Sequence, residues 1–275
     1  MSRLQTLGLA CGVAIGMCGS AQAGYTLLDN FNGYATGQTT VVTGNTWHAE
    51  FSNPDGTNHT GNSNIIDGGN GGNALQAKGG AAWRGAERDL TGTDAAVLVN
   101  ETQTFFWQVK VDYYGDTGIG DWVYDFMMGL SPSVDNIDTN NAWQDFSVMP
   151  YINNAPNSPY INANGPGTFW APMQRNVWTN VWVVINNDEF DPTFDLYYST
   201  GADAPVLVIQ DADWRNFAAG MDLNAIGFMA AGWEFSEYLI DNIYYADGVD
   251  LSYPVPSPGT LALIGLSGLV ARRRR

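Results

Sequence analysis

Carboxylates are the side chains of this sequence with the widest chemical use, and the chain holds 28 of them. Hydrolysis of a glycoside needs two carboxyl groups at a fixed separation across the scissile bond. The nearest pair is Glu234 and Glu237, whose odd spacing sends the side chains to opposite faces of a strand. A further acidic group, Asp188 with Glu189 and Asp191, falls in a predicted turn. We predict that these carboxylates are solvated, and the sequence assigns no catalytic residue.

Proton abstraction beside a carboxylate, the chemistry of polysaccharide lyases, needs a positioned base and acid. The segment with Arg84, Glu87 and Arg88 has suitable residue types but the wrong spacing. The histidines His48 and His59 have no partner pattern, and two histidines alone make neither a catalytic triad nor a zinc site. A lyase or hydrolase with an unrecognised site stays open as the alternative to a binding protein.

Sugar binding needs less, namely exposed aromatic rings with polar groups nearby. The chain has 10 Trp, 13 Tyr and 12 Phe. Three tryptophans, Trp107, Trp178 and Trp182, lie in apolar strand patterns and are predicted to be core. Other aromatic residues lie beside polar or Pro/Gly-rich segments, or within long insertions, and we predict that they rim a ligand face: Trp143, Trp170, Trp214, Tyr151 and Tyr160.

Strands must position these side chains, because the sequence contains no long helical stripe. In Phe105–Asp112, apolar residues alternate with Gln108 and Lys110, which is typical of a half-buried strand. The other predicted strands are 27–31, 73–77, 83–90, 122–130, 177–186, 194–199, 206–209, 223–230 and 238–245. Residues 53–72, 131–141 and 153–167 are predicted to be loops or insertions. This pattern predicts an all-β, antiparallel two-sheet β-sandwich.

The order of these pieces resembles the concanavalin A-like jelly roll, which includes laminin-G-like domains and many carbohydrate-active enzymes. The resemblance covers most of residues 25–248 and depends on Asp29–Phe31, Val181–Asn186, Phe194–Tyr198 and Ile240–Ile243. It implies that the first and last strands lie side by side. It also implies a structural cation near Asp29 and Asp241, for which calcium fits the oxygen ligands, while turn or strand-end capping is the alternative.

The N-terminus has a basic start, a short apolar stretch and an Ala21-Gln22-Ala23 site, which together predict a secretory signal peptide over residues 1–23. Both cysteines, Cys11 and Cys18, lie inside it. The mature protein is therefore predicted to have no disulfide and no thiolate metal site. The β-sandwich domain is predicted over residues 24–249.

The C-terminus is predicted to be a linker, 250–258, followed by a sorting helix and Arg cluster over 259–275. Its apolar run of eleven residues reaches only ~16 Å as a helix, about half of a membrane core. The segment resembles the PEP-CTERM sorting tail, on Pro256, Ser257 and Pro258 followed by the apolar run and four arginines, with Ser257 where the family usually has Glu. The resemblance implies removal by an exosortase, transient membrane association, and delivery to the surface or extracellular matrix of a bacterium. The arginines are Arg272, Arg273, Arg274 and Arg275.

Charge limits the partners of the domain. Five of the eleven basic residues lie in the terminal signals, which leaves six against 28 carboxylates and a formal charge of −22. Such a surface repels phosphate backbones, so nucleic acid is excluded as a partner. We predict an exported carbohydrate-binding or adhesive protein whose partner is an extracellular polysaccharide or matrix. The alternatives are the enzyme above and a purely structural matrix protein.

Overall fold

The computed structural model describes residues 24–49, 63–69, 71–113, 125–137, 142–154, 159–163, 170–217 and 219–254. The predicted signal peptide with both cysteines, His59, and the sorting tail from residue 255 onward lie outside the described residues. The side chain of Trp143 also lies outside them. The predictions made for these segments stay predictions.

The described chain is built from strands. They are β1 (Thr26–Asp29), β2 (Gly37–Gln38), β3 (Ser63–Asp67), β4 (Asn73–Asp89), β5 (Thr102–Tyr113), β6 (Asp125–Ser131), β7 (Pro150–Asn154), β8 (Pro159–Ala163), β9 (Ala171–Pro172), β10 (Thr179–Asn186), β11 (Thr193–Thr200), β12 (Val206–Asp213) and β13 (Ala225–Asp247). Three helices of four residues each accompany them: α1 (Thr39–Val42), α2 (Val134–Ile137) and α3 (Ala142–Asp145). Among these residues no helix is long and apolar enough to cross a membrane. The all-β prediction is confirmed.

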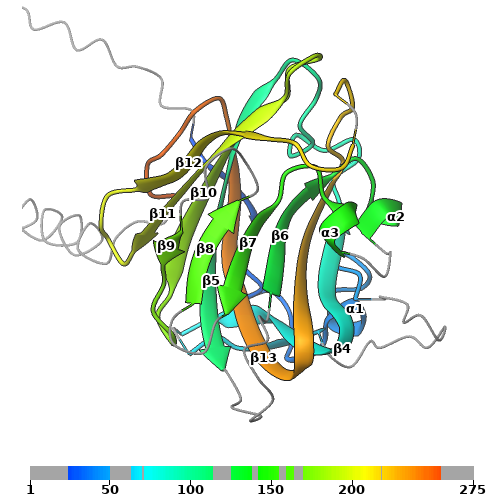
Figure 1. The fold of residues 1–275 in the computed structure, drawn as a ribbon. Coiled ribbons are helices and arrows are strands. Elements are labelled where there is room, and N and C mark those ends of the chain that lie inside the picture. Colours follow the sequence, from blue (N-terminus) through cyan, green and yellow to red (C-terminus); the bar gives the residue numbers. More distant parts are fainter. Residues whose placement is uncertain are drawn as a thin grey trace, which may run out of the picture.

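Two long strands, β4 and β13, pass through both layers of a sandwich. The first part of β13 (225–230) pairs with β6 and with the end of β4, whereas its last part (237–247) pairs with β5, β1 and the start of β4. The register of β13 shifts between these parts, at Ala230, Gly232 and Glu237. Figure 1 shows β13 in orange, bending sharply at its lower end. The two antiparallel sheets are therefore continuous through shared strands.

We call the two layers the front sheet and the back sheet. The front sheet has the order β4–β13–β6–β7–β8–β9, using the end of β4 and the start of β13. The back sheet has the order β12–β11–β10–β5–β13, beyond which lie β1 and the start of β4 with β3 and β2. The predicted antiparallel two-sheet β-sandwich is thus confirmed.

The first and last strands lie side by side, as predicted, since Thr26 pairs with Tyr245 and Leu27 with Tyr244. A bulge interrupts β13 between Asp241 and Tyr244, where Asn242 has a φ of 52°. The extra residue places Ile240 and Ile243 on the same inner face, because a bulge resets the alternation of a strand. The closure of the chain is therefore accompanied by a local break in the period of two.

The core fills the space between the sheets. In β5 the side chains of Phe105, Trp107, Val109 and Val111 are buried together on the inner face, as the alternation predicted. Phe228 on β13 packs edge-on against Trp107 at 5.7 Å between ring centroids. Burial of such rings is the main favourable term in forming the sandwich.

A second apolar cluster covers the outer face of the front sheet. Met127 on β6 and Met229 on β13 are fully buried there by residues that follow α2 and α3, including Phe146 and Met149. Figure 1 shows α2 and α3 beside β6 and β4. Ile137, within the insertion predicted over 131–141, belongs to the same cluster, so this insertion and the residues after it cover part of the sheet.

The segment predicted as a linker from residue 250 packs on the outer face of the back sheet, at least as far as Tyr253. Asp250 N–H donates to Thr104 Oγ1 (3.0 Å), and Trp182 Nε1 donates to the carbonyl of Ser252 (3.1 Å). The Tyr253 ring lies 5.8 Å from that of Trp182. These contacts attach residues 250–253 to the back sheet, while the predicted domain boundary at 249 stays a prediction.

Replacing Gly85 by alanine should lower the free energy of unfolding by about 3 kcal/mol, since overpacking against a backbone that cannot move is costly. A Cβ atom at Gly85 would lie 1.7 Å from the carbonyl oxygen of Phe228 on the paired strand. Urea unfolding measures the change. The matched control is Gly33→Ala, where no atom lies within 4 Å and a change of at most ~0.5 kcal/mol is expected. Equal stability of the two variants would contradict the close pairing of β4 and β13.

Candidate functional site

An exposed aromatic pair lies at the end of the front sheet. Trp170 precedes the edge strand β9 and keeps 52 % of its surface exposed. Tyr160 on β8 is half-buried, and its ring centroid lies 3.9 Å from that of Trp170, with 52° between the planes. Each ring fixes the other, so the pair presents a preformed apolar surface. We call Tyr160 and Trp170 the aromatic edge.

Polar groups follow the aromatic edge along β8 and β7. Asn162 lies two residues beyond Tyr160, so both side chains leave the same face of β8. Asn162 Nδ2 donates to the hydroxyl of Tyr151 (3.2 Å), its cross-strand partner on β7. The prediction that Tyr151 contributes an exposed ring is wrong, because this residue is only 8 % exposed and belongs to the second apolar cluster.

Arg215 adds a cation near Tyr151. Its backbone N–H donates to the carbonyl of Ser147 (3.0 Å), which holds the segment after β12 against the insertion. Partial burial lowers the pKa of Arg215, and the nearby Tyr151 opposes that shift. An arginine keeps its charge at neutral pH despite such a shift. Asn162 is fully buried and Tyr151 is 8 % exposed, whereas Arg215 is exposed, so of these three residues Arg215 is the one that presents its polar group to solvent.

The remaining predicted ligand residues do not join the pair. Trp214 is half-buried and packs against the main core, so only part of its ring reaches solvent. The backbone of Trp143 lies in α3, and the prediction for its side chain stays a prediction. Of the tryptophans predicted as core, Trp107 and Trp182 are fully buried. Trp178 is half-buried beneath the ammonium of Lys110, 5.5 Å from the ring centroid.

The residues considered for catalysis are placed apart. Asp188 accepts hydrogen bonds from the backbone N–H of Phe190 (2.8 Å) and Asp191 (3.0 Å) in the turn between β10 and β11, and these bonds lower its pKa. This confirms that the acidic group lies in a turn. Arg88 points to the inner side, where it contacts Asp29, whereas Glu87 is buried on the outer face of the front sheet. His48 pairs with Glu87 across an isolated bridge, so both side chains leave the same face.

Asp29 is buried among hydrogen-bond donors at the inner end of β1. Its Oδ1 accepts from Phe31 N–H (2.8 Å), and its Oδ2 accepts from Trp47 Nε1 (2.9 Å) and the Tyr34 hydroxyl (3.0 Å). Arg88 completes the set with an ion pair at 3.3 Å. Burial, and then the charge of Asp29, raise the pKa of Tyr34. This carboxylate therefore joins the turn after β1 to β4 and to the core.

Asp241 lies on the opposite face of β13. It pairs with Gln108 across β5, and its Oδ1 accepts from the N–H of Asn242 (2.7 Å) in the bulge. Asp29 instead pairs with Ile243 on the inner face. The structure therefore does not bring the two predicted calcium ligands together. Within the described ranges no group of three or more His, Cys, Asp or Glu residues could hold a metal ion.

Calcium itself stays a prediction, and removal of the metal tests it. If calcium stabilises the domain, a chelator should lower Tm, because a ligand that binds only the folded state adds to its stability. The measurement is a thermal melt of the purified domain with calcium and with excess chelator. An unchanged Tm would contradict the prediction that calcium stabilises the folded domain.

The fold defines the class of protein as a concanavalin A-like jelly-roll β-sandwich, and solved structures share this fold. The catalytic domain of a glycoside hydrolase family 131 protein from Coprinopsis cinerea matches with a TM-score of 0.52 and 15 % identity, over 82 % of this chain and 95 % of that one. A GH131 β-glucanase catalytic domain from Podospora anserina matches with a TM-score of 0.52 and 12 % identity, over 84 % of this chain and 100 % of that one.

A third similar structure is a marine PL-14 alginate lyase from Aplysia kurodai, with a TM-score of 0.50 and 9 % identity, over 81 % of this chain and 99 % of that one. At such identities the likeness shows the fold alone. No protein-family model matches the chain, and no curated protein matches it.

Asn162 and Arg215 were absent from the sequence predictions. A signal for Asn162 exists, because Ile161 and Ala163 alternate with Tyr160 and Asn162 over five residues. No comparable signal exists for Arg215. It follows a strand of the back sheet and reaches Tyr151 of the front sheet only through the tertiary fold.

Proposed function

We propose that this protein is an exported, non-catalytic carbohydrate-binding β-sandwich that binds glycan at the aromatic edge. The observation that carries the proposal is the exposed Trp170 ring, held against Tyr160 at the edge of the front sheet. A pyranose presents an apolar face of carbon-bound hydrogens, and a rigid aromatic ring buries that face at little entropic cost. The exposed guanidinium of Arg215, near Tyr151, supplies hydrogen-bond donors that suit sugar hydroxyls.

The jelly-roll fold supports this proposal without fixing it, since the similar structures include a β-glucanase and an alginate lyase. In this chain much of the outer face of the front sheet is filled by the second apolar cluster, including Met127, Met229 and Phe146. Because the cluster fills much of that face, we place the glycan-binding site at the edge of the front sheet. The extracellular location is proposed from the signal peptide and the sorting tail, with a polysaccharide or matrix as the partner and an exosortase as the processing enzyme.

A glycan array with the domain, residues 24–254, tests the proposal. We expect retention of one class of polysaccharide, and no release of reducing ends or unsaturated products when the same glycan is incubated with the protein. Absence of binding to every glycan would favour the structural matrix alternative.

A polysaccharide-degrading enzyme is the second candidate, favoured by the placement of His48 and the buried Glu87 on one face of the front sheet. Product formation that disappears in Glu87→Gln, with the fold intact, would establish that alternative. Product formation that persists in this variant would place catalysis elsewhere in the chain.

A further inference from the structure

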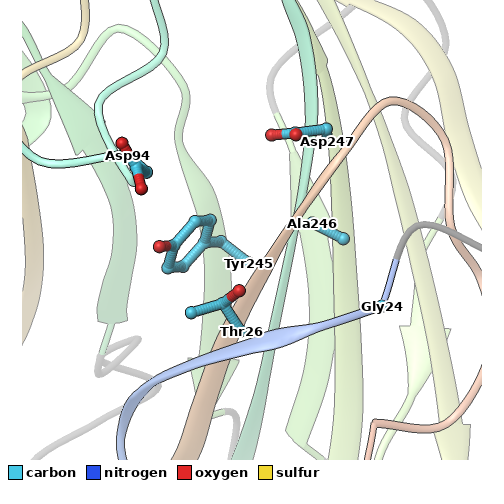
Figure 2. A pocket seen from close by; sticks show the side chains of 6 residues that line it. All are labelled: Gly24, Thr26, Asp94, Tyr245, Ala246 and Asp247. Carbon is cyan, nitrogen blue, oxygen red and sulfur yellow. The ribbon is translucent and has the colours of Figure 1, made fainter.

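A pocket of about 200 Å³ lies where β1 begins and β13 ends. Figure 2 shows Asp94 and Asp247 on either side of Tyr245, with Thr26 on β1 and Gly24 just before that strand. The pocket thus has two carboxylates in its wall and the first described residue of the chain at its mouth.

A buried amide supports the wall of the pocket without lining it. Gln103 is 3 % exposed, and its Nε2 donates to the backbone carbonyl of Asp94 (2.9 Å). Gln103 pairs with Asp247 across β5 and β13, so both side chains leave the same face. Its Oε1 is buried and has no hydrogen-bond partner in the described part of the protein. The groups that line the pocket and favour a donor-rich, positively charged ligand are therefore the carboxylates of Asp94 and Asp247.

The register of the sheet places Gly24 at this site. Thr26 pairs with Tyr245 and Leu27 with Tyr244, and continuing this register by two residues sets Gly24 opposite Asp247. The sequence predicts signal-peptide cleavage after Ala23, which makes Gly24 the first residue of the mature chain. Its α-amino group then has an ordinary pKa of about 7.7–8.0, and is a cation with three N–H donors at neutral pH.

We propose that the α-ammonium group of Gly24, created by cleavage after Ala23, binds in the pocket formed by Asp94 and Asp247. Before cleavage the same nitrogen is a neutral amide with one N–H, so the ion pairs form only in the processed chain. Cleavage of the signal peptide thereby adds an interaction that holds β1 against β13 in the back sheet. The proposal rests on the predicted cleavage site and is independent of glycan binding.

A comparison of two N-termini tests the proposal. Chain 24–275 is produced with a free Gly24 amine and, separately, with that amine acetylated, and both are melted between pH 6 and pH 11. At pH 7 the free amine should raise Tm by about 2–4 °C, the shift that one moderate interaction gives a domain of this size. The carboxylates raise the folded-state pKa of the amine, so the difference is complete below about pH 7.7 and is lost as pH rises through the raised value. Equal Tm values at pH 7, or a difference that persists at pH 11, would overturn the proposal.

Side-chain variants identify the pocket as the cause. Asp247→Asn in the free-amine chain should remove most of the Tm difference. Asp203→Asn, which changes an exposed carboxylate in the turn between β11 and β12, should leave the difference unchanged.

NMR titration of an isotope-labelled Gly24 amine provides a readout that does not depend on stability. Its pKa should exceed about 8 in the parent and fall toward the ordinary value in Asp94→Asn. An ordinary pKa in the parent would overturn the proposal. Because these chains begin at Gly24 by design, the result does not depend on cleavage in the cell, which mass spectrometry of the exported protein tests separately.

Discussion

Replacing Asp29 by alanine should lower the free energy of unfolding by about 3–5 kcal/mol, the usual loss when one partner of a buried ion pair is removed. The carboxylate is only 7 % exposed and accepts from Phe31, Trp47 and Tyr34 as well as pairing with Arg88. Without it, the buried indole N–H of Trp47 loses its acceptor, and the Arg88 guanidinium keeps, among the described residues, only the carbonyl of Leu28 as a hydrogen-bond acceptor. Urea unfolding of the domain measures the difference.

The control for this prediction is Asp203→Ala, which removes an exposed carboxylate and should change stability by at most ~0.5 kcal/mol. A loss below ~1 kcal/mol in Asp29→Ala would contradict the role given to this residue. It would mean that the turn after β1 is held by its apolar contacts, such as the packing of Phe31 on Trp47 at 5.5 Å between centroids.

Replacing Trp170 by alanine should weaken glycan binding at least tenfold, which corresponds to ~1.4 kcal/mol. The ring supplies the exposed half of the aromatic edge, and aromatic anchors carry a large share of binding energy at such sites. Because the side chain is 52 % exposed, the fold should keep its Tm within a few degrees. Isothermal titration with the glycan selected on the array measures the affinity.

The matched control is Phe190→Ala. Phe190 is an aromatic residue of the β10–β11 turn that is 84 % exposed and lies outside the aromatic edge. Its removal should leave the affinity unchanged. Equal losses in the two variants would mean that exposed rings act through general adhesion.

The sequence predicted the layers of the fold better than the paths of individual strands. The alternation of Phe105–Val111 reports a sheet face directly, because neighbouring side chains point to opposite sides. The segments predicted at 73–77 and 83–90 are instead one strand, β4, whose register against β13 shifts between Lys78 and Arg84. Glycine weakens the interior of a strand, so Gly79 and Gly80 favour the prediction that a strand ends there. In the structure, however, Gly80 pairs with Gly232 and the strand continues.

Two strands were hidden in segments predicted to be loops. β3 (Ser63–Asp67) and β8 (Pro159–Ala163) lie among residues rich in Asn, Gly and Pro, whose turn preference dominates a local interpretation. Their pairing partners, β4 and β7, are what make them strands. Long-range pairing of this kind leaves little trace in local composition.

The candidate site was predicted in outline only. Trp170 was expected to be exposed because it lies beside a Pro/Gly-rich segment, and Tyr160 and Tyr151 because they were assigned to the long insertions. Tyr151 differs from Trp170 in its exposure because of tertiary packing. Phe146 and Met149 belong to the cluster that buries Tyr151, whereas Trp170 lies outside this cluster and stays exposed. The predicted sharing of a site by Asp29 and Asp241 failed for a similar reason. The bulge at Asn242 changes which face each residue near it occupies.

A crystal structure of the domain, residues 24–254, with an oligosaccharide of the glycan class selected on the array tests the central claim most directly. We expect a sugar ring packed against Trp170 beside Tyr160, with its hydroxyls directed toward Arg215. An ordered sugar bound elsewhere, with Trp170 facing open solvent, would contradict it.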